Sequence, residues 1–106
     1  MQGKLLALSR ELAKLTDRVY HYRAPFETAP SYVVWAEDGR NDLLAGNVHV
    51  EGAWEGTIDL YTRTEFDELA DKIPETLEAL GCSWSLNSVQ VEDSGLIHHE
   101  WLFNLV

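Results

Sequence analysis

The spacing of apolar residues near the start of the chain predicts an amphipathic helix of about four turns. Four leucines recur every three or four positions and therefore share one side of an α-helix. They are Leu5, Leu8, Leu12 and Leu15. This side must pack on another surface, either the chain's own sheet or a neighbouring subunit.

Other segments alternate with a period of two or are rich in β-branched and aromatic residues, which predicts strands. The predicted strands cover residues 19–23, 32–36, 48–51, 57–62, 82–91 and 97–105. In the last of them, one face carries a strongly apolar set. Its members are Ile97, His99, Trp101, Phe103 and Leu105.

Several short segments between the strands predict turns or irregularities. Residues 37–42 contain an Asp-Gly pair, which suits a turn or an exposed loop. Gly52 and Gly56 predict a bulge or bend. The phase of the alternation slips near Asn87-Ser88, which predicts a bulge, and residues 92–95 predict a hairpin turn.

A second helix is predicted from about Glu65 to Leu80. Thr64 precedes acidic residues in the first turn, where the helix dipole favours them, and Gly81 is a good terminator. Pro74 removes a backbone hydrogen bond, so we expect a kink there or two short helices. The predicted buried stripe consists of Phe66, Leu69, Ala70, Ile73, Leu77 and Leu80.

The order helix, strands, helix, hairpin predicts an α+β fold in a single domain spanning residues 1–106. We expect an antiparallel or mixed sheet of four to five strands, with the two helices packed on one face.

The distribution of charge favours contacts with proteins over contacts with nucleic acid. Eighteen acids and eight bases give a formal net charge of −10, and such a surface repels phosphate. Residues 1–23 carry five bases and two acids, whereas the remainder carries three bases and sixteen acids. This polarity can attract copies of the chain to each other, although it can equally serve solubility alone.

A single cysteine, Cys82, excludes an intrachain disulfide and a cysteine-based zinc site. We expect a buried, reduced thiol there. The apolar stretch at the N-terminus is interrupted by charges, so no signal peptide is expected, and no apolar run approaches the roughly 18 residues of a membrane span.

The sequence His98-His99-Glu100 is a candidate metal site. Neighbouring side chains on a strand point to opposite faces, so His98 can share an ion with Glu100 but not with His99. His49 is a third candidate ligand if its strand lies alongside. His99 lies on the apolar face, where a hydrogen-bonded core or interface histidine is the simpler interpretation.

Sequence motifs for catalysis are missing. The chain has no Gly-x-Ser-x-Gly, Walker loop or dinucleotide fingerprint. Most of its carboxylates belong to a predicted solvated helix face. We therefore expect no catalytic residues, no metal and no cofactor, and we do not expect an enzyme.

The layout resembles small prophage tail-completion and tail-terminator-like proteins, which are minor tail components involved in head–tail joining. The resemblance covers the order of elements and a series of short motifs. These are Tyr22-Arg23-Ala24-Pro25, Pro30 to Val34, Ala45 to Val48 and Thr57 to Thr62. It implies a ring, usually a hexamer, that caps the tail tube at its head-proximal end and contacts the head connector. Such a protein would belong to the virion tail, after assembly in the host cytoplasm, and DNA would cross the ring without sequence recognition.

Contacts between copies would then carry the function. The expected interface residues are two leucines in a charged loop, a tryptophan beside it and charged residues of the two helical regions. They are Leu43, Leu44, Trp54, Arg10, Arg18 and Glu68. The alternative from a different class is a small acidic binding module, such as an inhibitor of a host protein.

Overall fold

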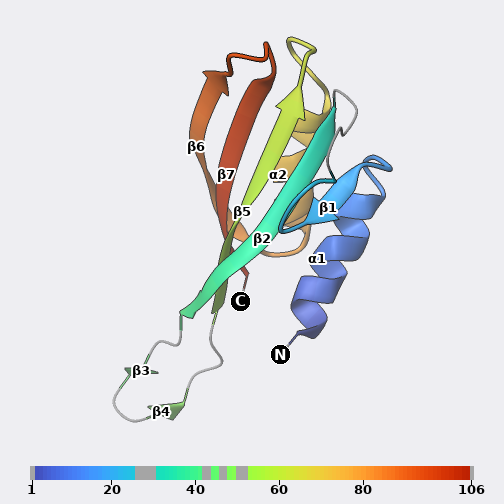
Figure 1. Cartoon of the computed structure of the whole chain (residues 1–106). Helices are drawn as coiled ribbons and strands as arrows, with labels where there is room; N and C mark the ends of the chain where they lie inside the picture. The colour runs from blue at the N-terminus through green and yellow to red at the C-terminus, as the bar shows by residue number, and fades with distance from the viewer. Residues whose placement is uncertain (1, 26–30, 42–43, 46–47, 50–52, 106) are drawn as a thin grey trace.

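The computed structural model describes residues 2–25, 31–41, 44–45, 48–49 and 53–105. A five-stranded mixed sheet has both helices behind one of its faces (Figure 1), which confirms the predicted α+β class. The strand order is β1-β2-β5-β7-β6, with β1 parallel to β2 and the remaining pairs antiparallel. The elements are α1 (Gly3–Ala13), β1 (Val19–His21), β2 (Tyr32–Asn41), β3 (Leu44–Ala45), β4 (Val48–His49), β5 (Ala53–Thr62), α2 (Leu69–Ala79), β6 (Ser83–Val91) and β7 (Ile97–Leu105).

The core lies between the helices and the sheet face that they cover. Leu8 and Leu12 of α1 are fully buried, so the leucine side of this helix packs on the chain's own sheet. From the sheet, Ile58 and Leu60 of β5 meet them, together with the apolar face of β7 predicted from its alternation. The buried side chains of that face are Trp101, Phe103 and Leu105.

The strand β2 is longer than predicted. Residues 37–41, which were predicted to form a turn or an exposed loop, belong to this strand, and Asp42 lies outside the described residues. The strand continues to Asn41 because the first residues of β5 pair with it, and the extra residue Asp38 is absorbed by an irregularity between Glu37 and Gly39. The backbone partner, which the local sequence does not reveal, outweighs the turn preference of Asp-Gly.

The bulge or bend expected from Gly52 and Gly56 is found on the partner strand: β5 runs without interruption from Ala53 to Thr62, and the irregularity opposite Glu55 and Gly56 lies in β2. Gly56 has a different purpose: a Cβ atom there would lie 2.2 Å from the Ala36 carbonyl oxygen and 2.6 Å from the Phe103 ring. Glycine lets β2 and the Phe103 ring approach the β5 backbone closely. Gly52, the other residue of that prediction, lies outside the described residues.

The helix α2 begins four residues later than predicted, at Leu69. Phe66, expected in the buried stripe, has a φ of 56° and a fully exposed side chain. The Asp67 carboxylate, rather than Thr64, accepts the Leu69 backbone N–H at 2.9 Å, which is the role of a capping side chain. Pro74 lies inside one helix, so the expected division into two short helices is wrong.

The edge strand β6 contains the predicted irregularity, between Leu86 and Ser88. It pairs only with β7, and its outer edge has no partner strand among the described residues. Cys82 lies between α2 and β6 and is 6% exposed, which confirms the expected buried thiol. Burial raises the pKa of this thiol.

Candidate functional site

The uncovered face of the sheet carries a compact group of ionisable side chains. Asp59 of β5 pairs with Glu100 of β7, and Tyr61 pairs with His98. Residues of β5 and β7 that are two positions apart share a face, so this register brings all four side chains onto the face opposite the helices.

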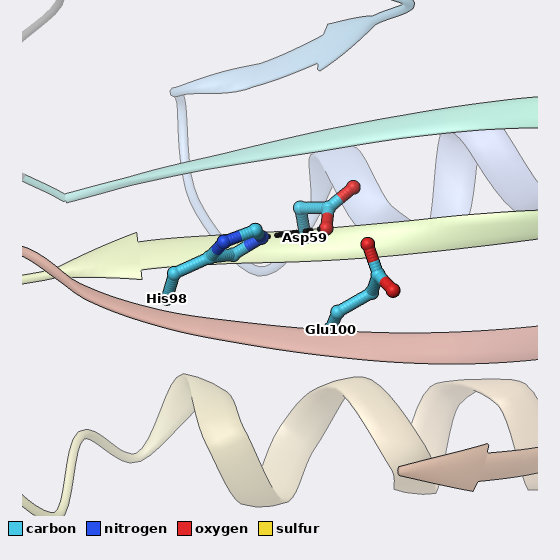
Figure 2. Close-up of side chains that lie close together, drawn as sticks. All are labelled: Asp59, His98 and Glu100. Atoms are coloured by element: carbon cyan, nitrogen blue, oxygen red, sulfur yellow. Dashed lines mark hydrogen bonds and ion pairs between the residues drawn. The ribbon is translucent and has the colours of Figure 1, made fainter. Parts of the chain in front are cut away.

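An aspartate, a histidine and a glutamate form the centre of this group (Figure 2). The Nε2 atom of His98 lies 2.7 Å from Oδ1 of Asp59, and potential ligand atoms of Asp59, His98 and Glu100 all lie within 4.8 Å of one another. Two further side chains lie beside the group, and one of them is hydrogen-bonded to it. Asn87 donates from Nδ2 to Oε1 of Glu100 at 2.6 Å, and Oε1 of Glu92 lies 3.7 Å from Nδ1 of His98.

A row of stacked rings continues from the histidine across three strands. Tyr61 stacks on His98 with ring centroids 4.3 Å apart, and Tyr32 of β2 stacks on Tyr61 at 4.8 Å. Stacking of this kind restrains the imidazole plane and keeps Nε2 directed toward Asp59.

The electrostatics of the group are unusual for a sheet surface. The Asp59 side chain is 15% exposed, and burial raises its pKa to about 6, with the Glu100 carboxylate acting in the same direction and the hydrogen bond to His98 opposing it. Burial, followed by the nearby Asp59 and Glu92 carboxylates, raises the pKa of Tyr61 to about 12. Two carboxylates close together therefore favour a bound proton or a cation.

This arrangement can do two things chemically. It can hold a proton on the Asp59 carboxyl, whose pKa is raised to about 6, or it can offer one imidazole nitrogen and two carboxylate oxygens to a divalent ion.

The structure changes the metal site expected from the sequence. His98 and Glu100 do share a face, but His49 lies in β4, which pairs with β3 in a separate two-stranded sheet. Figure 1 places that sheet at the far end of the β2–β5 hairpin, away from β7. The third member is Asp59, which sequence reasoning missed. Its alternation with Ile58 and Leu60 put it on the outer face, but the register with β7 was needed to place it beside Glu100.

The residues expected at an interface belong to several different elements of the fold. Arg10 on α1 and Arg18 before β1 are exposed, and Glu68 precedes α2, with Oε2 3.5 Å from Nζ of Lys72. Trp54 is half-buried against the core, Leu44 begins β3 and Leu43 lies outside the described residues. His99, expected in the core or an interface, is half-buried, and burial lowers its pKa.

Comparison with known proteins does not assign the chain. No family model matches its sequence, and no curated protein matches it at a significant level. Within the part of the chain that the structure describes, neither helix has the length and apolar character needed to cross a membrane.

Proposed function

We propose that this chain is a structural subunit of a phage tail, a tail-terminator or tail-completion protein that assembles into a ring at the head-proximal end of a long tail. In this role it contacts the tail-tube and head-connector proteins and converts no substrate. The resemblance in element order and short motifs motivates the proposal.

The single observation that carries it is the opposite character of the two sheet edges. Figure 1 shows α1 and β1 along one side of the molecule and β6 along the other. The first side belongs to the segment with five bases and two acids, and the second is bordered by the acidic face of α2. Two edges of opposite charge favour contacts in which one edge of a subunit binds the other edge of the next identical subunit. Such contacts close into a ring when the rotation between neighbouring subunits divides a full turn.

Two further features support an assembly role. The β2–β5 hairpin runs past the ends of the neighbouring strands and carries β3 and β4 at its far end (Figure 1), where it can reach an adjoining protein. The net charge of −10 would keep a passing DNA duplex from adhering to the ring.

Sedimentation velocity over a range of concentrations, with negative-stain electron microscopy of the assembled fraction, tests the proposal. We expect a concentration-dependent oligomer and annular particles. A chain that remains a monomer and captures one host protein tightly would instead support the acidic binding module.

A further inference from the structure

The edge strand β6 displays an unusual row of apolar side chains. Trp84, Leu86, Val89 and Val91 lie on the face that the helices cover elsewhere, yet they are 36%, 52%, 51% and 73% exposed. A nine-residue edge strand with exposed apolar side chains invites association, and soluble proteins usually protect such an edge.

The row borders a groove of about 540 Å³ between β6 and α2. Its floor includes Trp84, Leu86 and Val89, and its wall includes Asp71 and Glu75 of α2. Asp71, Glu75 and Glu78 are spaced along one exposed side of the helix, and Nε1 of Trp84 donates to Oε1 of Glu78 at 3.2 Å. This surface, the β6 groove, is therefore apolar in the middle and negatively charged along one rim.

The opposite edge of the molecule has the complementary character. Leu6 of α1 and Tyr22 after β1 are 51% and 60% exposed and line one hollow of about 430 Å³. Arg10 lies one helical turn beyond Leu6 and is exposed. These three residues define the α1 edge.

Tyr22 is held in an uncommon conformation at this edge. Its φ is 73°, its ring stacks on His21 at 3.8 Å and its hydroxyl donates to the Glu37 carboxylate. The Glu37 carboxylate also lies 2.6 Å from Nε2 of His21, so the one acid of the hollow is already engaged. Left-handed backbone at a bulky residue is costly and often marks a contact or functional position.

We infer that the β6 groove receives the α1 edge of a second copy of this chain, with Leu6 and Tyr22 on the apolar floor and Arg10 facing Asp71 and Glu75. This inference rests on the proposed ring, for which it names the contacting surfaces. Because the two surfaces lie at opposite edges of the sheet, each copy in a pair keeps one unused surface, and the contact propagates from subunit to subunit.

Two single substitutions test the contact. Leu86→Asp disables the groove and Leu6→Asp disables the α1 edge, and both sites are half exposed, so circular dichroism and melting curves should show folded proteins. Each variant alone should self-associate at least roughly tenfold more weakly than the unchanged chain. An equimolar mixture should form a dimer and stop, since only one intact surface of each kind remains. Leu102→Asp, at a 40% exposed leucine on the open face, is the matched control and should assemble normally.

Charge reversal provides a second, milder test of the same contact. Arg10→Glu and Glu75→Arg should each weaken assembly at low salt, and one chain carrying both should recover it.

The possible failures are distinguishable. If the unchanged chain forms rings and both leucine variants do so equally well, the contact is overturned and the ring stands. If Leu6→Asp assembles normally while Leu86→Asp does not, two β6 edges pair with each other and the inference is wrong. A chain that is monomeric at its highest soluble concentration overturns both the contact and the ring.

Discussion

Replacing Asp59 by asparagine should stabilise the protein at neutral pH. The carboxyl pKa changes from 3.8 in a free side chain to about 6 in the folded chain, and a difference of this size corresponds to about 3 kcal/mol against the ionised form. Asparagine removes the charge but keeps an oxygen that can accept a hydrogen bond from His98. The weaker, uncharged hydrogen bond offsets about 1 kcal/mol of the gain, so we expect the free energy of unfolding to rise by about 2 kcal/mol near pH 7.5.

The pH dependence separates this mechanism from a general effect of the substitution. The folded-state pKa is raised, so the folded chain binds a proton more readily, and the cost of ionising Asp59 appears as the pH rises from 3.8 through about 6. The gain from Asp59→Asn should therefore shrink steadily as the pH is lowered from about 7.5 to about 4.5. Urea denaturation, followed by tryptophan fluorescence at each pH, measures the unfolding free energies of the unchanged chain and of Asp59→Asn.

A neighbouring carboxylate supplies the control for this experiment. Glu55 lies on the same face of β5 but is exposed, so Glu55→Gln should change the unfolding free energy little at either pH. If Asp59→Asn destabilises the protein by the same amount at both pH values, the carboxylate contributes through its hydrogen bond alone and the electrostatic reasoning is refuted.

Three further predictions follow from close contacts and polar networks. Gly56→Ala should lower the unfolding free energy by about 3 kcal/mol or prevent folding, because its Cβ would meet a carbonyl oxygen and an aromatic ring. Gly39→Ala is the control: no atom lies within 4 Å of its new carbon, so the same denaturation assay should show almost no change. Thr62→Val should lower the unfolding free energy by about 2 kcal/mol, since the fully buried hydroxyl donates to Asp67 at 2.7 Å, whereas Thr76→Val, which removes an exposed bond within a helix, should change it little; equal losses would contradict the argument. Zn²⁺ added near neutral pH should raise the melting temperature by offsetting the repulsion of two carboxylates, His98→Ala should abolish that rise, and no rise in the unchanged chain would rule out the cluster as a set of ligands.

The register of the sheet explains why the candidate site was only partly visible in the sequence. Alternation placed His98 and Glu100 on one face of a strand, and this prediction is confirmed. His49 was a candidate third ligand only if its strand lay alongside, whereas β5 pairs with β7 and brings Asp59 into position. Pairing joins residues about forty positions apart, and no local pattern specifies which strands meet.

The helix α2 illustrates the same limit at the level of a single element. Its apolar spacing predicted Ile73 and Leu77 as buried, and both are. The spacing also included Phe66, but Asp67 hydrogen-bonds to Thr62 of β5 and to the Leu69 backbone, so the helix starts after it. The side-chain hydrogen bonds of Asp67, one of them to a buried threonine five residues earlier, therefore decided where the helix begins.

Periodicity in the sequence determined the fold class, the buried side of α1 and the inward face of β7, because burial of apolar surface acts through spacings of two and three to four residues. Tertiary structure decided that β2 extends through residues with turn preference and that position 56 must be glycine. It also decided that Asp59 lies beside His98 and Glu100. Finally, it placed the basic N-terminal segment near one sheet edge and the acidic side of α2 beside the other. These features depend on which distant segments lie side by side, and that choice is made by the packing of the whole chain rather than by any segment's own pattern.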